Sequence, residues 1–310
     1  MPASPPKPID AAGADPAARF HWHRGATMIV GAGVFWSTGG LLMRLVEQAT
    51  PWQILFYRSL ALTLFFIAIL AVTGKLASLR RGGWALVLAA LGVTGAFVGF
   101  VFSITHTTVA NTFFLLATQP MLTALLAWFF LHERPDAKTW WAMVIALVGV
   151  SAMVLDGLAS GTLFGNAMGL VSAIGFAVLT VTLRANRLVD MRPGIALGGV
   201  FTSVLAATVL LIGQHSSAPV LQTFSVSSFD GLLCFLSGSV QIGCGMALYT
   251  LGTRWVSASH AALFALSEVL LAPVWVWFVF AERPSLYTFV GGAILLLAIV
   301  IRSWPSSASR

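Results

Sequence analysis

Two stretches of the sequence decide the fold: residues 111–139, NTFFLLATQPMLTALLAWFFLHERPDAKT, and residues 260–288, HAALFALSEVLLAPVWVWFVFAERPSLYT. A constant shift of 149 residues aligns them without a gap, and six of the last twelve positions are then identical. These are Trp128, Phe129, Glu133, Arg134, Pro135 and Thr139 in the first copy and Trp277, Phe278, Glu282, Arg283, Pro284 and Thr288 in the second. In both copies an apolar run ends at an acidic-basic-proline corner and a second apolar run follows. A repeat of hydrophobic hairpins predicts a membrane protein built from two like halves.

The composition points to the same class of protein. The chain has 310 residues, of which 58% are hydrophobic and only 9% are charged, and its mean hydropathy is +0.91. Soluble domains carry about 25% charged residues, so this chain could not cover a globular surface with polar side chains. The net charge of +7 does not indicate a nucleic-acid partner, because the basic residues lie between apolar runs, as in membrane loops. The main partner predicted is the lipid bilayer.

About 20 apolar residues are needed for a helix to cross the hydrocarbon core. The sequence contains ten such runs, at residues 27–46, 52–72, 84–104, 109–131, 139–155, 163–183, 195–212, 231–252, 258–280 and 285–302. The short alternating strands of a membrane barrel are absent from the pattern. We therefore predict an all-α integral membrane protein with ten transmembrane helices.

The basic residues predict the orientation. If the amino terminus is cytoplasmic, 14 Lys and Arg residues fall in inside segments and only two, Arg44 and Arg283, fall outside. This bias predicts that both termini lie in the cytoplasm. Each half then has five helices, and because five is odd the second half is inverted relative to the first. Inverted repeats are typical of secondary transporters.

The expected organisation has four parts. Residues 1–26 form a disordered cytoplasmic tail, residues 27–156 the first five-helix repeat, residues 163–302 the second repeat, and residues 303–310 a second cytoplasmic tail.

The ten runs, the five-plus-five repeat, the Phe35-Trp36 pair, Arg58 in the second run and the apolar run ending in Glu-Arg resemble the drug/metabolite transporter superfamily, specifically its EamA-type members. The resemblance covers roughly residues 27–302. In that family the fourth and ninth helices often carry a Glu-Pro pair; here Gln119-Pro120 and Glu268-Val269 each keep half of it. The resemblance implies export of amino acids or related metabolites across a bacterial inner membrane.

Glu268 and Gln119 are the strongest site candidates from the residues themselves. Each is the eleventh residue of a 23-residue run, so both are expected near the bilayer midplane. A carboxylate at that depth costs roughly 2.5–3.5 kcal/mol and should face a cavity or a partner. Glu268 is therefore predicted to contact the substrate or to carry a coupling proton. The alternative is a protonated Glu that joins two helices by hydrogen bonds.

Two further candidates lie in the first two runs. Arg58 could bind an anionic group of the substrate or pair with Glu268, or its long side chain could snorkel to the outer interface. Trp36 is the tenth residue of its run and so lies too deep for an interfacial belt. Its indole N–H needs a partner, which a polar cavity or a neighbouring helix would supply.

Three weaker candidates complete the predicted site. Asn111 and His260 are repeat mates near the starts of the fourth and ninth runs, where either could gate a cavity mouth, although a lone His at a helix start is more often an interfacial hydrogen-bonding group. Tyr249, in the eighth run, could contribute to a polar lining.

No motif in the sequence indicates a nucleotide, a metal or another cofactor, and no Ser/His/Asp or Cys/His set indicates an enzyme. The predicted function is a secondary transporter, with alternating access around a midplane cavity, a small-molecule substrate and protons as a candidate coupling ion. The alternatives are a membrane-embedded enzyme or a partner subunit that does not transport.

Overall fold

The structure, a computed structural model of the whole chain, describes residues 16–80, 83–107, 109–154, 162–214, 224–280 and 286–303. Every regular element within these ranges is helical. The prediction of an all-α membrane protein is therefore confirmed. The repeated corner at residues 282–284 and the terminal segments 1–15 and 304–310 lie outside the described residues.

Ten apolar segments form the bundle. Eight of them, counted over the described ranges, are long and apolar enough to cross a membrane, and the shorter helices at residues 137–152 and 286–301 supply the fifth and tenth. The first repeat consists of α1 (Pro16–Ser37) with α2 (Gly39–Leu45), α3 (Pro51–Val72), α4 (Gly83–His106), α5 (Val109–Leu116) with α6 (Gln119–Leu131), and α7 (Ala137–Val154). A short 3₁₀ helix, η1 (Leu76–Arg80), lies between α3 and α4.

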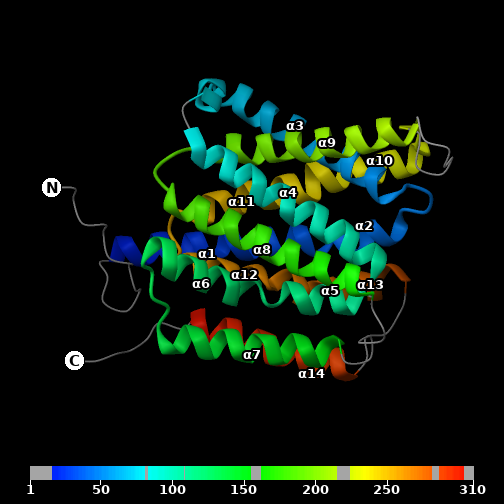
Figure 1. Cartoon of the computed structure of the whole chain (residues 1–310). Coiled ribbons are helices and arrows are strands. Elements are labelled where there is room, and N and C mark those ends of the chain that lie inside the picture. The colour runs from blue at the N-terminus through cyan, green and yellow to red at the C-terminus, as the bar shows by residue number, and fades with distance from the viewer. Residues whose placement is uncertain are drawn as a thin grey trace, which may run out of the picture.

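The second repeat follows the same order. It consists of α8 (Leu163–Ala185), α9 (Arg192–Gln214), α10 (Ser228–Leu236) continued by the π-helix η4 (Ser237–Cys244) and α11 (Gly245–Gly252), α12 (Ala258–Ala265) with α13 (Ser267–Phe280), and α14 (Leu286–Ser303). In Figure 1 all spans run along one axis, and the start of α1 and the end of α14 lie at the same end of the bundle. We call this the terminal end. Helix α1 leaves it, whereas α8 runs toward it, as inverted repeats require.

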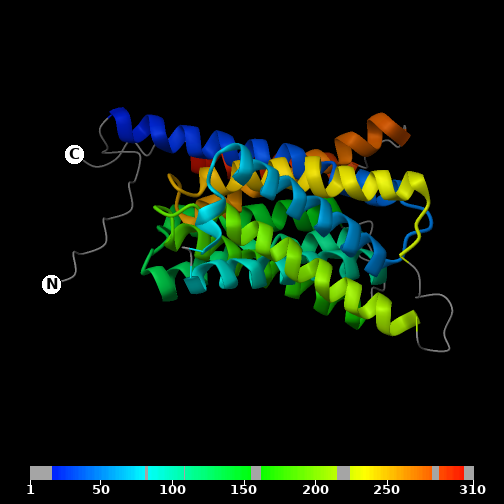
Figure 2. The ribbon, with the colours of Figure 1, turned by 90° about the horizontal axis from the view of Figure 1, so that it is seen from above.

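The packing of the spans follows the inversion. Helix α1, the first span, packs against α11 of the eighth span. The equivalent contact joins α8, the sixth span, to α4, the third span. The second and seventh spans, α3 and α9, pair with each other, as do the fifth and tenth, α7 and α14. Figure 2 shows α1 beside the span formed by α10, η4 and α11. Every major contact of one repeat thus has its counterpart in the other.

Glycine allows the close contact between α4 and α8. A Cβ atom on Gly99 would lie 2.4 Å from the backbone nitrogen of Ser172, and one on Gly175 would lie 2.4 Å from that of Ala96. Backbone atoms cannot move aside as a flexible side chain can. The two helices therefore pack backbone against backbone, which is the usual use of small residues between membrane helices.

Two predicted spans are broken at equivalent places. The fourth is interrupted after Leu116 and resumes at Gln119; the ninth is interrupted at Leu266, which the 149-residue shift aligns with Ala117. In the fourth span, Pro120 has no N–H to donate to the carbonyl of Leu116, so the helix hydrogen bonding cannot continue through this point. The hydrophobic pattern alone predicted continuous helices in both places.

The first span also differs from its prediction. It is helical from Pro16, so residues 16–26 extend the first helix. It is then interrupted at Thr38, where the hydroxyls of Ser37 and Thr38 donate to the carbonyl oxygens of Val34 (2.6 Å) and Phe35 (2.8 Å). Such bonds from Ser and Thr to the preceding turn bend helices. The sixth span, α8, which is the repeat mate of the first, is continuous.

Candidate functional site

A cavity of about 90 Å³ lies between the two repeats. Its polar and aromatic lining includes Trp36, Arg58, Gln119, Ser172, Gln241 and Glu268. The first three come from the first repeat and the last three from the second. A water molecule needs roughly 10–15 Å³ of such space, so the cavity has room for several waters or for a small polar ligand.

Gln119 and Glu268 line this cavity together. Each stands in the first turn of the helix that follows a break, α6 for Gln119 and α13 for Glu268. Because the breaks are equivalent, the two side chains enter the cavity from symmetry-related helices. Gln119 is buried and Glu268 is partly exposed to the cavity. The ion pairs that join described residues lie elsewhere in the molecule, so the carboxylate of Glu268 is not paired directly with a cation of those residues.

Arg58 is the cationic side chain of the cavity. It is only 5% exposed, and its guanidinium lies over the rings of Phe97 and Phe100, at 4.9 and 5.5 Å from their centroids. Its Nε has no hydrogen-bond partner among the described residues. The side chain does not reach the outer interface, so the snorkelling alternative is wrong. Two aromatic faces hold the cation in place.

The backbone of Arg58 is also closely packed, against η4 of the eighth span. A Cβ atom on Gly238 of η4 would lie 2.0 Å from the carbonyl oxygen of Arg58. Only glycine therefore lets the eighth span pack this tightly on α3. The contact fixes the position of the arginine backbone against η4.

Trp36 has both kinds of partner considered from the sequence, since it lines the cavity and also packs against other rings. Its ring centroid lies 5.4 Å from that of Phe176 and 5.2 Å from that of Tyr249. Its carbonyl oxygen, freed by the break in the first span, accepts a hydrogen bond from Nε2 of Gln241 at 3.2 Å. The aromatic cluster and this hydrogen bond hold the wall of the cavity at the break.

Gln241 also lines the cavity. It belongs to η4, whose sequence SGSVQIGC is unusually polar and small for the middle of an apolar span, and its Oε1 accepts from the hydroxyl of Ser237 at 2.9 Å. The π-helix was not predicted, although that cluster of small and polar residues was its signal. Short π-helical stretches occur frequently at functional sites.

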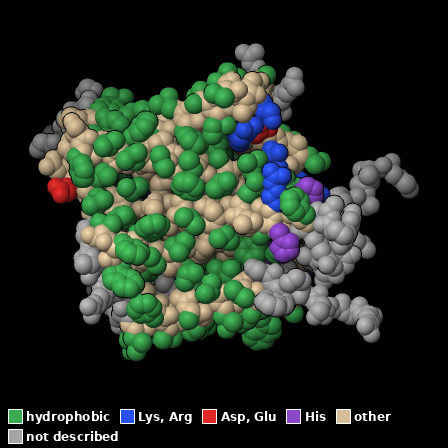
Figure 3. Space-filling view, turned by 180° about the vertical axis from the view of Figure 1, so that it is seen from behind, with side chains coloured by type: hydrophobic (Ala, Val, Ile, Leu, Met, Phe, Trp, Pro, Cys, Tyr) green, Lys and Arg blue, Asp and Glu red, His purple; other side chains and the backbone are tan. Residues whose placement is uncertain are grey.

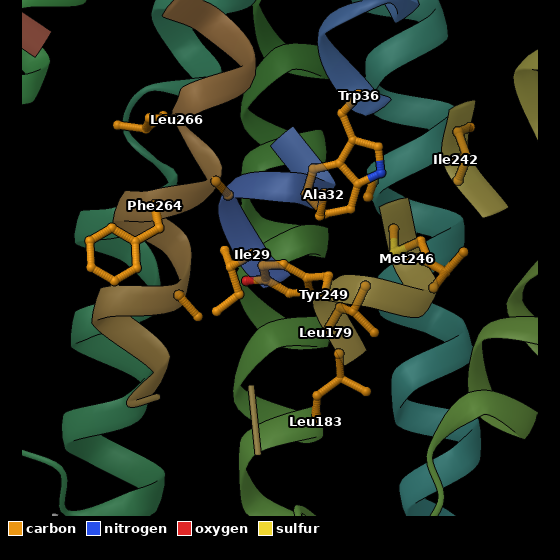
Figure 4. Packing of buried hydrophobic residues seen from close by; sticks show 14 of the residues in the cluster. Ile29, Ala32, Trp36, Leu179, Leu183, Ile242, Met246, Tyr249, Phe264 and Leu266 are labelled. Carbon is orange, nitrogen blue, oxygen red and sulfur yellow. The ribbon is translucent and has the colours of Figure 1, made fainter. Parts of the chain in front are cut away.

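Tyr249 lies beside the cavity and does not line it. It is fully buried, and its hydroxyl is 2.8 Å from Oγ1 of Thr180, with either atom able to donate. Figure 4 shows Tyr249 next to Trp36, with Leu179 and Leu183 beyond it. These side chains are buried and packed together. The space between the cavity and the terminal end is therefore filled by side chains.

His260 and Asn111 lie outside the cavity. His260, in the first turn of α12, contacts Ser257 and lies near Trp22, at 6.3 Å between ring centroids. Asn111, in the first turn of α5, donates from Nδ2 to Oγ1 of Thr107 at 3.0 Å. Neither is a lining residue. A gating role for either residue stays a prediction.

Charge is distributed unevenly along the bundle. Figure 3 shows Lys and Arg side chains gathered at the terminal end. One cluster joins Asp190 to Arg192, whose Nε donates to Oδ1 at 2.8 Å, and to Lys75 at 3.9 Å. Burial alone would raise the pKa of Asp190, but the hydrogen bonds and charge of Arg192 outweigh it and hold this pKa below its usual value. The loop carboxylate is therefore ionised at neutral pH.

The sequence profile of the EamA-like transporter family matches residues 23–155 and 163–304, which together are most of the chain. The chain belongs to the EamA-like transporter family. This EamA-family protein is thus an integral membrane transporter with a lipid environment and a small-molecule substrate, as the resemblance implied.

Its relatives carry similar names. It is 23% identical over 272 residues to the pseudopaline exporter CntI of Pseudomonas aeruginosa, covering 86% of this chain and 92% of the relative. It is 25% identical over 281 residues to the uncharacterized transporter YwfM of Bacillus subtilis, covering 88% and 91%. A solved crystal structure matches with a TM-score of 0.75 at 16% identity, over 90% of this chain and 96% of that one. At such low identity this match shows the fold alone.

Proposed function

We propose that this protein is a secondary transporter that exports small metabolites such as amino acids, by alternating access around the cavity between its repeats. The transporter class comes from the family. The direction and the cargo are proposed from the cavity, from the family resemblance and from the name of one relative as an exporter.

The arrangement of Arg58 and Glu268 carries the proposal. Both line the same cavity, one is a basic and the other an acidic side chain, and no direct ion pair joins them in the described part of the chain. Buried charges are expensive unless they are paired or functional. A cargo with a carboxylate for the guanidinium and an amino group for the carboxylate would satisfy both, which favours amino acids and close relatives of them.

Glu268 is the group we propose for proton coupling. It is the carboxylate of the cavity, and it can hold a proton or release it without leaving the site. If proton entry and cargo exit compete for this one carboxylate, a proton gradient can drive the cargo. Gln119, its counterpart, cannot take part in this step because an amide does not ionise at physiological pH.

We also propose that both termini face the cytoplasm, in a bacterial inner membrane. The gathering of Lys and Arg at the terminal end supports this orientation, because cytoplasmic loops are rich in these residues. Labelling of single-cysteine variants in intact cells tests it: Lys138→Cys should be shielded from an impermeant reagent, and Leu286→Cys should be accessible. The reverse pattern would contradict the orientation.

The transport proposal can be tested with purified protein in liposomes. The vesicles are loaded with a mixture of the twenty amino acids, a proton gradient is imposed, and efflux is measured by mass spectrometry against protein-free vesicles. Efflux of one or more amino acids supports the proposal. Chemical turnover without flux would favour the membrane enzyme, and neither flux nor turnover would favour the partner subunit.

A further inference from the structure

The acidic residue of the first corner reaches across the repeat interface. Glu133, just after α6, accepts a hydrogen bond at its Oε1 from Nε of Arg184 in the last turn of α8, at 2.8 Å. Its Oε2 accepts from the backbone nitrogen of Ala258, the first residue of α12, at 3.3 Å. One carboxylate of the first repeat thus joins two spans of the second.

Arg184 extends this connection to a third span of the second repeat, at the end of α11. Its Nη1 donates to the carbonyl oxygens of Thr253 (3.4 Å) and Arg254 (3.2 Å), which follow α11. Its side chain is 6% exposed, and that of Glu133 is 16% exposed. The ion pair is therefore largely buried, and it ties together the terminal ends of the fourth, sixth, eighth and ninth spans.

One row of side chains on α8 leads from the cavity to this ion pair. Ser172, Phe176, Thr180 and Arg184 are spaced four residues apart, so each lies next to the one before it, about 6 Å further along the axis, while the row turns gradually round the helix. Ser172 and Phe176 line the cavity. The hydroxyl of Thr180, closer to the terminal end, is hydrogen-bonded to that of Tyr249. Arg184 follows one turn further toward the terminal end. A cargo that passes from the cavity to that end along this row must cross both contacts.

We propose that the Glu133–Arg184 ion pair is a latch that closes the cavity at the terminal end. The Thr180–Tyr249 hydrogen bond forms a second closure between this ion pair and the cavity. The proposal deepens the proposed function, on which it rests, by naming the groups that control access from one side. Opening the latch separates Glu133 from Arg184, Ala258 and the carbonyl groups after α11, so that the fourth span can move away from the second repeat.

An ion pair suits this task. Each partner held alone in a dry interior would be strongly unfavourable, so the closed state requires both. When the end opens, both groups meet water and are solvated again. The pair therefore stabilises the closed arrangement and does not prevent the opening of this end. Glu133 also accepts from the first N–H of α12, where a negative charge is favoured by the helix dipole.

Thiol labelling at Thr180 tests the latch without any cargo. In a background with Cys234 and Cys244 replaced by alanine, Thr180→Cys is probed with an impermeant maleimide applied to the terminal side of membrane vesicles. The double variant Glu133→Gln/Arg184→Gln removes both charges together. We expect its labelling rate to rise about fivefold or more, which is the lower range of typical conformational coupling.

The matched control is Asp190→Asn/Arg192→Gln. It removes another ion pair at the same end, whose partners are two residues apart. Asp190 also lies 3.9 Å from Lys75, between the second and third spans, but these ion pairs do not include the fourth or the ninth span. Its labelling should equal that of the parent. If the latch double variant does not fold, Arg184→Lys serves instead, because it keeps the charge and loses the Nε and Nη1 donors; its rate should rise as well.

The results separate two failures. Unchanged labelling in a latch variant that unfolds at a temperature close to the parent would overturn the latch, whatever is transported. A rise in the Asp190→Asn/Arg192→Gln control equal to that in the latch variant would overturn it too, because loosening would then be general. A rise confined to the latch variant supports the latch even if the liposomes show no amino-acid efflux, a result that would count against the proposed function alone.

Discussion

Gln119 and Glu268 occupy equivalent positions in the two repeats and meet in one cavity, each in the first turn after a break in its span. Their positions are equivalent but their side chains differ in chemistry, because the amide is always neutral and the carboxylate can exchange a proton. The two halves of the cavity therefore offer equivalent geometry and unequal charge. This difference makes separate predictions possible for the two residues.

Replacing Glu268 with Gln should uncouple transport from the proton gradient. We expect gradient-driven efflux to be lost, while exchange of labelled for unlabelled amino acid across the vesicle membrane continues, because the cavity keeps its shape. Efflux and exchange are measured in parallel in liposomes. Gln119→Ala is the matched control and should retain the gradient dependence. If the Glu268→Gln variant still responds to the gradient, Glu268 is not the proton carrier.

Replacing Arg58 with Lys should weaken the binding of amino acids that carry a free carboxylate. Lysine keeps the charge but lacks the planar fork that binds a carboxylate by two hydrogen bonds. Since hydrogen bonds to charged groups contribute about 1.5–3 kcal/mol, affinity should fall roughly tenfold to hundredfold. Thermal shift measures it, because a ligand that binds the folded state stabilises it.

The amino-acid amides, which lack the carboxylate, serve as comparison ligands for this variant. Their binding should be the same in the parent and in Arg58→Lys. An equal loss for acids and amides would show that the substitution damages the cavity as a whole.

Replacing Gly238 with Ala should destabilise the protein. The new Cβ would lie 2.0 Å from the carbonyl oxygen of Arg58, so one helix must shift. Overpacking of this kind costs about 1–3 kcal/mol, and we expect a lower apparent unfolding temperature together with weaker ligand binding. Gly40→Ala is the control, because nothing lies within 4 Å of its added Cβ. Equal unfolding temperatures for the two variants would contradict the contact.

The Asp190–Arg192 pair should contribute stability that depends on pH. The pKa of Asp190 is held below its ordinary value of 3.8 in the folded protein. The contribution is therefore present above that value and is lost as the pH falls through the lower, folded-state pKa. The difference in unfolding temperature between the parent and Asp190→Asn should be small, as for other partly exposed pairs, and should vanish in strong acid. A difference that grows with acidity would contradict this assignment.

Much of the architecture could be predicted because the membrane restricts what the chain can do. Ten apolar runs must become helices, since lipid leaves backbone groups no other partners. The identities shared by Trp128 and Trp277, and by Glu133 and Glu282, indicated the repeat without any structure. The odd number of helices in each half then required the inversion. These inferences use length and pattern, which the sequence displays directly.

The details of the cavity could not be predicted in the same way. The break at Thr38 depends on hydroxyl groups that bond to the preceding turn, and the π-helix at Gln241 depends on contacts with Trp36 from another repeat. The role of Glu133 was missed for a similar reason. Glu133, a corner residue of the first repeat, contacts Arg184 only when the two repeats are packed together. The separation of the two residues along the chain gives no sign of this contact.

The broken first span and its continuous mate α8 have a consequence for energetics. Were the halves identical, exchanging their shapes would yield two facing states of equal free energy. Here the exchange would have to straighten a span that is interrupted at Thr38 and interrupt one that is continuous. If the protein works by the proposed alternating access, the empty carrier should rest more often facing one way than the other, even with no gradient across the bilayer.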